Sequence, residues 1–259
     1  MGSTVCRAVA DDPDLELVAA VDPRLAGIDI YQATGVEGSD VQVEGDAEAL
    51  LHAETQVAVD FTEIAAAREN LRWCAANGVH AVVGTTGFTG DDVTELNRLF
   101  SEQCSCVLSA NFAIGAALMT RFAELAAPYV ETAEIVELHH DAKIDAPSGT
   151  SLRVAQGMAR ARREAGTGGW GEDPTRTEVV KGSRGATGPG GIRMHAVRLR
   201  GLVAHHEVIL GAAGQTLTIR HDSYDRTSFM PGVLLAIKSV AERPGLTLGL
   251  DALLGLGER

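Results

Sequence analysis

The sequence has few cysteines, few aromatic residues and no long uncharged apolar run. Its cysteines, Cys6, Cys74, Cys104 and Cys106, are too few and too irregularly spaced for a disulfide framework or a four-thiolate zinc site. No apolar stretch approaches the ~20 residues that span a bilayer, and no basic segment followed by an apolar core opens the sequence. We therefore expect a cytoplasmic protein with reduced cysteines and no membrane partner.

Positive charge is also scarce. The chain has 22 lysines and arginines against 35 aspartates and glutamates, which gives a net charge of −13. A surface of this sign repels polyanions, so we expect no nucleic-acid partner. In contrast, apolar residues make up 45% of the 259 residues and glycines number 29. That composition can bury a sizeable core and is typical of an α/β enzyme rather than a disordered chain.

Residues 1–111 alternate short β-branched runs with helical stretches. This order predicts a parallel sheet with helices on both faces. One helix is expected to stop at the pair Asn77-Gly78 and another to start at Thr89, whose hydroxyl can cap it. Residues 23–45 are expected to be a loop with at most a short edge strand. The predicted strands are 15–21, 56–62, 80–86 and 106–110, and the predicted helices are 3–10, 63–76 and the one that starts at Thr89.

Beyond Asn111 the pattern changes to one helix, one strand, a second helix and then a run of strands. This order predicts an α+β domain with a mixed or antiparallel sheet. A closing helix is expected to pack back against the first domain. The predicted helices are 115–127, 148–164 and 228–242, and the predicted strands are 133–140, 192–201, 203–211 and 215–222.

The start of the sequence matches part of a dinucleotide-binding Rossmann pattern. Gly2 precedes a predicted helix, and Asp22 ends the next strand 20 residues later (22 − 2), the spacing of the acid that binds the ribose. The opening strand and the earlier glycines are absent. We therefore expect that Met1 is an internal methionine and that the natural chain starts about 10 to 20 residues upstream. The alternative for Asp22 is a turn that it begins with Pro23.

The densest polar cluster runs from Glu137 to Thr150, where a predicted strand ends and a helix begins. Active sites of α/β proteins lie at such strand ends. His139 and His140 point to opposite faces of an extended chain, so one of them can enter a cleft. Imidazole titrates near neutral pH, and Lys143 can deliver a proton or hold an anion. The pattern favours proton transfer on a negatively charged substrate.

The same segment continues into Ser148-Gly149-Thr150. Ser148 is expected to cap the helix, and the free amides at its start can bind a carboxylate. Each feature also has a plain structural interpretation, as a packed histidine pair or as a simple cap. A metal site is an alternative for His139, His140, Asp141 and Asp145, but Lys143 would repel the ion. Cys104 and Cys106 are a second, weaker metal alternative.

Two further clusters end the third and fourth predicted strands of the first domain. Gly84-Thr85-Thr86-Gly87 allows close approach of the backbone to a ligand, and Ser109-Ala110-Asn111-Phe112 lies at the same sheet edge. Both suggest contact with the ribose or nicotinamide of a dinucleotide, and a plain strand-to-helix turn is the alternative. His205-His206-Glu207 is interpreted as a sheet-edge or subunit-contact feature.

Taken together, these segments resemble the dihydrodipicolinate reductase family of bacterial lysine and diaminopimelate biosynthesis. The chain resembles an actinobacterial member that lacks its N-terminus, because only Met1-Gly2 remains of the glycine-rich loop. The resemblance rests on Glu137-Leu138-His139-His140-x-x-Lys143-x-Asp145-Ala146-Pro147-Ser148-Gly149-Thr150, on Gly84-Thr85-Thr86-Gly87, on Asn111-Phe112, and on the stretch from Arg220-His221-Asp222 to Phe229.

The resemblance implies a reductase that uses NADH or NADPH. Its substrate would be 4-hydroxy-tetrahydrodipicolinate, a small cyclic dicarboxylate, which loses water and is reduced to tetrahydrodipicolinate. His139 would be the acid/base residue and Lys143 the proton donor, and His140, Gly149 and Thr150 would contact the substrate carboxylates. The implied cofactor contacts are Met1, Gly2, Asp22, Gly84, Thr85, Thr86, Ser109, Ala110, Asn111 and Phe112. No metal ligand is implied.

The resemblance also implies a domain plan. Residues 1–111 with 226–259 would form an α/β, Rossmann-like dinucleotide-binding domain whose first strand is missing. Residues 112–225 would form the α+β substrate-binding domain, through whose mixed sheet family members assemble as homotetramers. The choice between the cofactors stays open, since Asp22 favours a free ribose diol whereas Arg24 suits a 2′-phosphate.

Two alternatives to this function remain at the level of sequence. The absence of a first strand is compatible with a non-catalytic subunit or a ligand-binding remnant. Another two-domain nicotinamide oxidoreductase, acting on sugars or amino acids, would share the fold without needing the histidine, lysine and Ser-Gly-Thr grouping.

Overall fold

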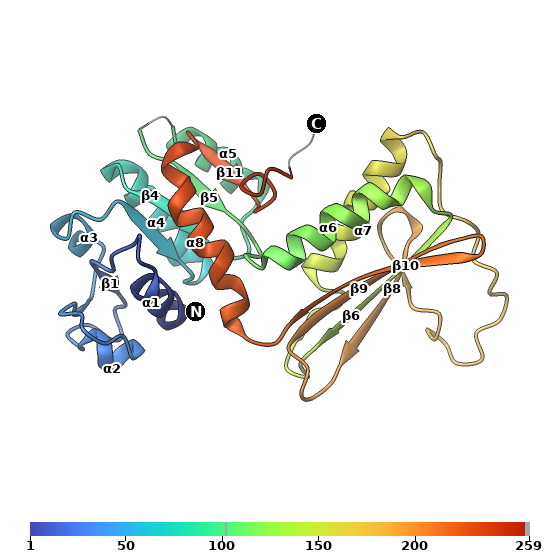
Figure 1. Ribbon diagram of the computed structural model, residues 1–259, viewed down its shortest axis with the longest axis horizontal. Coiled ribbons are helices and arrows are strands. Elements are labelled where there is room, and N and C mark those ends of the chain that lie inside the picture. Colours follow the sequence, from blue (N-terminus) through green and yellow to red (C-terminus); the bar gives the residue numbers. More distant parts are fainter. Residues whose placement is uncertain (102, 257–259) are drawn as a thin grey trace. The chain divides into compact units, whose positions relative to one another are not determined.

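The chain folds into two compact units, each with its own sheet and apolar core (Figure 1). The computed structural model describes residues 1–101 and 103–256. Unit 1 comprises Met1–Ile114 and Arg226–Arg259, and unit 2 comprises Gly115–Asp225. The prediction of a parallel-sheet domain followed by a mixed-sheet domain is confirmed. None of the helices in the described ranges has the length and apolar character needed to cross a bilayer.

Unit 1 contains two parallel ladders. The larger has the strand order β11-β5-β4-β3, and the smaller pairs β1 with β2. Because β3, β4 and β5 run parallel, their carboxyl ends meet at one edge of the sheet. The strands are β1 (Ala20–Val21), β2 (Val43–Glu44), β3 (Val57–Asp60), β4 (His80–Val83), β5 (Cys106–Leu108) and β11 (Leu246–Leu248).

The helices of unit 1 begin and end where local side chains satisfy their free backbone groups. The Glu63 carboxylate accepts from the amides that start α4, and Gly78 ends that helix at φ 71°, as the Asn77-Gly78 pair predicted. Thr89 and Asp92 form the capping box of α5. The helices are α1 (Gly2–Asp11), α2 (Ile30–Thr34), α3 (Glu48–His52), α4 (Ile64–Asn77), α5 (Gly90–Leu99) and α8 (Met230–Ser239), with 3₁₀ turns η3 (Arg226–Phe229) and η4 (Val240–Glu242).

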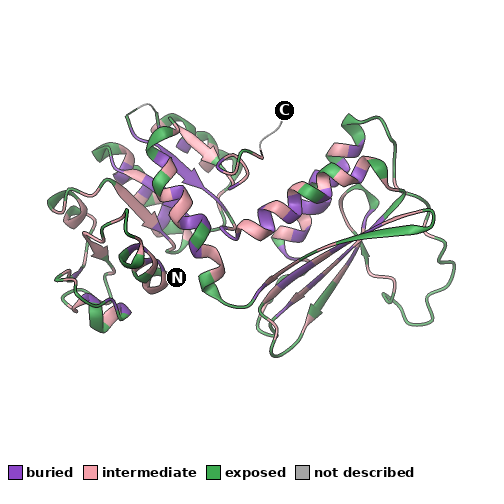
Figure 2. Ribbon diagram, in the orientation of Figure 1, coloured by how far each residue is buried: buried purple, intermediate pink, exposed green. Residues whose placement is uncertain are grey.

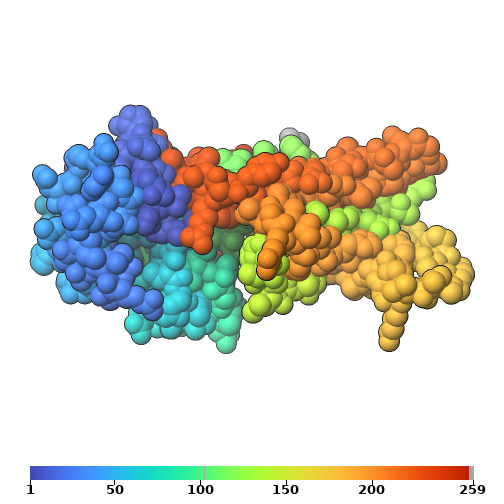
Figure 3. All heavy atoms as spheres, turned by 90° about the horizontal axis from the view of Figure 1, so that it is seen from below, coloured from blue at the N-terminus to red at the C-terminus, as the bar shows by residue number. Residues whose placement is uncertain are grey.

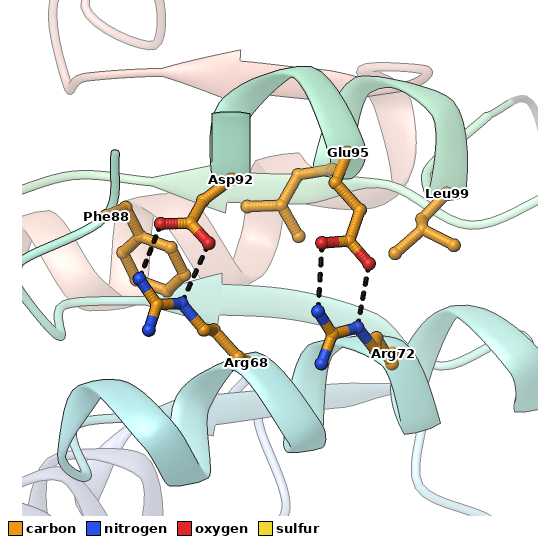
Figure 4. Close-up of a pocket in the computed structure, with 7 residues that line it drawn as sticks. Arg68, Arg72, Phe88, Asp92, Glu95 and Leu99 are labelled. Carbon is orange, nitrogen blue, oxygen red and sulfur yellow. Dashed lines mark hydrogen bonds and ion pairs between the residues drawn. The ribbon is translucent and has the colours of Figure 1, made fainter. Parts of the chain in front are cut away.

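Two bidentate ion pairs join α4 to α5. Arg68 binds Asp92 at 2.8 Å and Arg72 binds Glu95 at 2.7 Å, and the two guanidinium groups lie side by side along α4 (Figure 4). The hydrogen bond from Arg68 holds the pKa of Asp92 well below its usual range. The capping carboxylate of α5 therefore also fixes the neighbouring helix, and this cluster is a structural clamp.

The core of unit 1 lies between its larger sheet and the helices α4 and α5. Buried residues of β4 and β5, which Figure 2 colours purple, pack against Leu71 and Leu96. Cys74, Cys104 and Cys106 are buried in this core, as expected for packing residues. Burial raises the pKa of Cys74 to about 12, so its thiol stays protonated.

Two local predictions in unit 1 were wrong in part: the strand predicted at 15–21 forms only at Ala20–Val21, and residues 23–45 contain the helix α2 besides β2. The short elements α3 and β11 were not predicted. Short elements give too few residues for a hydrophobic period to be read. The helix α2 depends instead on the Asp29 side chain, which accepts from Tyr31 N–H, and on Gly35, which ends the helix in the left-handed region.

Unit 2 is a five-stranded mixed sheet with two helices on one face. The strand order is β10-β9-β6-β8-β7, with β6 and β8 parallel and the other neighbours antiparallel. The strands are β6 (Thr132–His139), β7 (Ala186–Thr187), β8 (Arg193–Arg198), β9 (Ala204–Ala212) and β10 (Gln215–Ser223), and the helical elements are α6 (Ile114–Ala126), η1 (Ala127–Tyr129), α7 (Gly149–Glu164) and η2 (Pro189–Gly191).

The helices α6 and α7 cover one face of this sheet (Figure 1). Met119 and Met158 from these helices pack with Ile135 and Leu210 of the sheet. Within the described residues of unit 2, no helix covers the opposite face, which carries Val136, Leu138 and Ile209 among charged residues. The glycine-rich loop of residues 165–185 runs over the surface of the unit, in yellow to gold in Figure 3.

The interpretation of His205-His206-Glu207 as a sheet-edge feature was wrong. These residues lie in β9, which pairs with β10 on one side and with β6 on the other. His205 and His206 are both buried. The sequence pattern could not reveal this, because the order of strands in a sheet is fixed by long-range pairing rather than by local periodicity.

We expect Gly232→Ala to destabilise unit 1. Gly232 lies in α8, and a Cβ at this position would lie 2.1 Å from the carbonyl oxygen of Phe112. The clash is with backbone, so we expect a loss of about 1–3 kcal/mol despite the better helix propensity of alanine. Thermal unfolding followed by circular dichroism measures it. Gly90→Ala in α5, where the new Cβ meets nothing within 4 Å, is the matched control and should be neutral or stabilising. Equal melting temperatures for the two variants would contradict the expectation.

Candidate functional site

The candidate site in unit 2 is organised around a buried carboxylate on β6. Glu137 has no solvent exposure, and His139, two residues further along the same strand, is 7% exposed. Residues two apart on a strand share a face, so both side chains lie on the side that α7 covers. The carboxylate of Glu137 pairs with Nδ1 of His139. It also accepts from both terminal nitrogens of Arg198 on β8, each at 2.8 Å.

The charges of this cluster are set by burial and by pairing. Burial opposes ionisation of Glu137, but hydrogen bonds from Arg198 and His139 outweigh it and hold the pKa of Glu137 below its usual value. Burial is also the largest influence on His139 and lowers its pKa. Glu137 acts against that shift, whereas the positive charges of Lys143 and Arg198 add to it. The arrangement therefore holds a carboxylate beside an imidazole that is neutral near pH 7.

The N-terminus of α7 is tied to the same carboxylate. The N–H of Ser148 donates to Glu137 at 3.1 Å. The hydroxyl of Ser148 accepts from Ser151 N–H, which is the predicted cap, and it lies 2.9 Å from Nε2 of His206. Gly149 and Thr150 follow as the first residues of the helix. The predicted helix start and the predicted histidine thus lie in one cluster.

His206 completes the cluster from β9. Its ring meets that of His139 edge to face, with the centroids 5.2 Å apart. Burial lowers the pKa of His206 to about 4. Nδ1 of this ring is buried and has no hydrogen-bond partner among the described residues. His206 is therefore neutral at physiological pH and adds no charge to the site.

Lys143 lies in the loop between β6 and α7. Its ammonium binds both oxygens of Asp145, at 2.7 and 2.9 Å, and this contact lowers the pKa of Asp145. The loop is anchored to the cluster because Arg198 also donates to the carbonyl of Asp145, at 2.6 Å. His140, which directly follows β6, is exposed, and its carbonyl accepts from Lys143 N–H. The loop therefore presents one exposed imidazole and one paired ammonium.

In unit 1, the loops that follow β3, β4 and β5 lie together at one sheet edge. Gly84 N–H donates to the carbonyl of Asp60, and Ser109 N–H donates to that of Val83. The hydroxyl of Thr85 donates to the Asp60 carboxylate at 2.9 Å. Asp60 also accepts from Thr62 and Asn70. This carboxylate holds the loop after β4 against the loop after β3.

Other predicted cofactor residues shape the same edge. A Cβ at Gly84 would lie 2.0 Å from the ring of Phe61, so the close approach there requires glycine. The ring of Phe61 packs against that of Phe112, and the two ring centroids are 5.8 Å apart. Ser109 and Asn111 stabilise the turn through Ala110, because the Ser109 hydroxyl donates to the Asn111 carbonyl and the Asn111 side chain accepts from Ala113 N–H. Thr86 continues the loop after Gly84 and Thr85.

The structure shows no hydrogen bond, among the described residues, between these loops and the other predicted cofactor residues, Met1, Gly2 and Asp22. Met1 is the N-cap of α1 and Gly2 is its first residue. Asp22 follows β1, and its carboxylate accepts from Arg24 N–H at 2.9 Å, which is the turn that was the alternative interpretation. In the described part of the chain, no hydrogen bond or ion pair joins Asp22 to the loops after β3, β4 or β5.

The site contains three residues that were not predicted to have a role in it: Glu137, Arg198 and His206. Glu137 had a usable signal, since it precedes His139 by two residues on one strand and must share its face. Arg198 and His206 had none, because they reach the site only through the register of β8 and β9 on β6. Neither metal alternative finds support: the residues that the structure describes contain no group of three or more histidine, cysteine, aspartate or glutamate side chains placed to hold an ion.

Nearly the whole chain is similar to known proteins. Residues 1–112 match the family model for the N-terminus of dihydrodipicolinate reductase, and residues 115–254 match that for its C-terminus. The 4-hydroxy-tetrahydrodipicolinate reductases of Cutibacterium acnes and Corynebacterium urealyticum are 47% and 44% identical, each over 99% of this chain and 95% of their own. The dipicolinate-bound dihydrodipicolinate reductase of Paenisporosarcina sp. TG-14 superposes with a TM-score of 0.84 and 38% identity, over 97% of this chain and 94% of its own.

More distant similarity concerns the fold alone. An amine dehydrogenase from Mycobacterium smegmatis matches all of this chain and 94% of its own, with a TM-score of 0.63 and 18% identity. The two-unit plan is thus shared with dehydrogenases of other specificity.

We expect His206 to make stability depend on pH below neutrality. In the unfolded chain its pKa returns to the ordinary value near 6.5, whereas in the folded chain it is about 4. The unfolded state therefore binds a proton first as the pH falls, and stability is lost between these two values. At pH 5 the loss from this residue is about 2 kcal/mol. Urea unfolding at pH 7.5 and pH 5.0 measures it. In His206→Gln, the difference between the free energies of unfolding at the two pH values should be smaller by about 2 kcal/mol. A variant that keeps the full wild-type difference would contradict the assignment.

Proposed function

The chain belongs to the dihydrodipicolinate reductase family, and from this premise we propose which residues carry out its reaction. The protein is an oxidoreductase that reduces 4-hydroxy-tetrahydrodipicolinate to tetrahydrodipicolinate with NADH or NADPH, in lysine and diaminopimelate biosynthesis. The observation that carries the proposal is that one cluster in unit 2 joins His139 to the capped N-terminus of α7, in a chain that matches the family along its whole length.

The proposed substrate site uses His139, His140, Lys143, Gly149 and Thr150. The N-terminus of α7 carries the positive end of the helix dipole and suits a carboxylate. The exposed imidazole of His140 and the ammonium of Lys143 supply further hydrogen bonds or charge for a second carboxylate. A dicarboxylate would compete with Asp145 for Lys143, since that ion pair is exposed to solvent.

Proton transfer is assigned to His139 and Lys143. Loss of the substrate hydroxyl as water requires a proton on the leaving oxygen, and addition of hydride must be followed by protonation of the ring. Nδ1 of His139 is held by Glu137, so Nε2 is the nitrogen that exchanges a proton with the substrate. The Lys143 ammonium is the second proton source, and it regains its proton from solvent.

The proposed cofactor site uses the loops after β3, β4 and β5. These loops fit a dinucleotide because they lie together at the carboxyl edge of a parallel sheet. Gly84, Thr85, Thr86, Ser109, Ala110, Asn111 and Phe112 would hold the nicotinamide end, and Met1, Gly2 and Asp22 the phosphates and ribose. The bound cofactor supplies the hydride. Asp22 and Arg24 leave the preference between NADH and NADPH open.

The other functional classes receive no support. A non-catalytic remnant would not need an intact proton-transfer cluster, and the relatives that cover 99% of the chain are reductases. An oxidoreductase acting on sugars or amino acids would share the fold without needing this cluster, and the amine dehydrogenase of Mycobacterium smegmatis matches this chain only at the level of the fold.

Assembly as a homotetramer through the sheet of unit 2 is part of the proposal. Within the described residues of unit 2, no helix lies over the face of the sheet opposite α6 and α7. It carries the cross-strand apolar pair Leu138 and Val197, and Ile209 on β9. Pairing two such faces would bury these apolar side chains between subunits. We also place the protein in the cytoplasm, which its four unpaired cysteines support because thiols stay reduced there.

We expect His139→Ala and Lys143→Ala to lower turnover far more than they weaken NADH binding. General acid/base groups contribute about 10²- to 10⁴-fold to a rate, so kcat should fall within that range. The reductase assay gives kcat, and calorimetry with NADH and with a pyridine dicarboxylate gives the two affinities. Unchanged turnover in both variants would overturn the assignment. Dicarboxylate binding without nucleotide binding in the unaltered chain would instead favour the remnant.

We expect the protein in solution to have about four times the mass of the 27.2 kDa chain. Ile209→Lys places a charge on the helix-free face of the sheet and should shift the assembly to smaller species. Tyr129→Lys is the control, because Tyr129 is 84% exposed in η1 and outside the sheet, and it should leave the mass unchanged. Sedimentation velocity measures both. A monomeric unaltered chain, or a tetramer unaffected by Ile209→Lys, would count against this interface.

A further inference from the structure

Glu137 is the most deeply buried ionisable side chain of the site, and its surroundings are those of a permanent carboxylate. It has no solvent exposure, and both carboxylate oxygens have hydrogen-bond partners within the protein. Oε2 pairs with His139 and Arg198, and Oε1 pairs with Arg198 and with the Ser148 N–H. A buried charge is tolerated only with such compensation. The negative charge is therefore built into the fold at the position directly behind His139.

This carboxylate touches the imidazole on the side away from the exchangeable nitrogen. A carboxylate can only accept a hydrogen bond, so the ring must carry its proton on Nδ1. Nε2 is then unprotonated in the neutral ring and becomes an acid when the ring gains a second proton. Among the described residues, Nε2 of His139 makes no hydrogen bond, so this nitrogen can bind a substrate.

We propose that Glu137 is a positioning residue for His139, which it orients and holds in the tautomer that presents Nε2 to the substrate, and that Arg198 tunes this effect by sharing the same carboxylate. The proposal rests on the acid/base role assigned to His139. Glu137 does not touch the substrate. It acts through the imidazole, and through Ser148 N–H it also fixes the start of α7, where a substrate carboxylate would bind.

Besides burial, three charged groups influence the charge on His139. Glu137 on β6 favours the imidazolium, whereas Arg198 on β8 and Lys143 in the loop disfavour it. His206 on β9 lies edge to face with the ring and is neutral at the working pH. Glu137 and Arg198 therefore act on one proton with opposite sign. A role in packing alone would give no such opposition.

The test compares Glu137→Gln with Arg198→Gln. The matched control is Glu134→Gln, because Glu134 lies on the same strand but on its opposite face, where it likewise joins an arginine, Arg184, to a histidine, His195. Nitrogen-15 NMR of the histidine rings gives the tautomer and the pKa of His139, whose signals are assigned by their loss in His139→Asn. The reductase assay gives kcat and KM against pH for the same proteins.

In the unaltered protein the ring of His139 should be protonated on Nδ1. Glu137→Gln should lower the pKa of His139 by about 1 to 3 units, and Arg198→Gln should raise it. In the assay, Glu137→Gln should lower kcat by about 10- to 100-fold, with a smaller change in KM, and should move the acidic limb of the pH profile in the same direction as the NMR pKa. Glu134→Gln should leave the His139 signals unchanged.

The proposal is overturned if unaltered His139 carries its proton on Nε2, or if both variants move the pKa of His139 in the same direction. The first result does not need Glu137→Gln, so it decides the matter even if that variant fails to fold. The NMR measurement also needs no substrate. An inactive unaltered protein would thus refute the proposed function while the tautomer and the opposite pKa shifts still test the role of Glu137.

Discussion

A carboxylate without access to water must find hydrogen-bond donors within the protein, and Glu137 finds them on separate segments of unit 2. Arg198 comes from β8, the Ser148 N–H from the start of α7, and His139 from β6 itself. Satisfying one buried charge therefore brings together the side chains and the helix end on which the proposed chemistry depends. Arg198 extends this control to the loop that carries Lys143, through the carbonyl of Asp145.

Unit 1 uses a buried carboxylate in a similar way. Asp60 ends β3 and accepts from Thr62, Asn70 and Thr85, so the loops after β3 and β4 keep their relative positions. The parallel sheet then places the loop after β5 at the same edge. In both units the backbone brings the candidate site residues near one another. One buried carboxylate then fixes the local geometry of the segments that carry them.

Sequence patterns predicted elements well where the signal is local and strong. The helix caps at Ser148 and Thr89 and the helix end at Gly78 are formed by side chains or backbone angles within a few residues. Prediction missed α2, α3 and β11 and made the strand at β1 too long, because these elements are too short for a hydrophobic period to be read. It also failed for His205-His206-Glu207, whose position in the sheet depends on pairing with residues more than 60 positions earlier in the chain.

The sequence by itself determined the two-unit α/β plan, the candidate residues His139 and Lys143, and the resemblance to a reductase family. Those features rest on periodicity, on caps and on a motif contained within a short stretch. Only the tertiary structure decided that Glu137 is paired on every side, that Arg198 and His206 belong to the site, and that Asp22 makes a turn with Arg24. The physical reason is that burial and strand register are properties of the folded chain, and they set both the charge of a side chain and its partners.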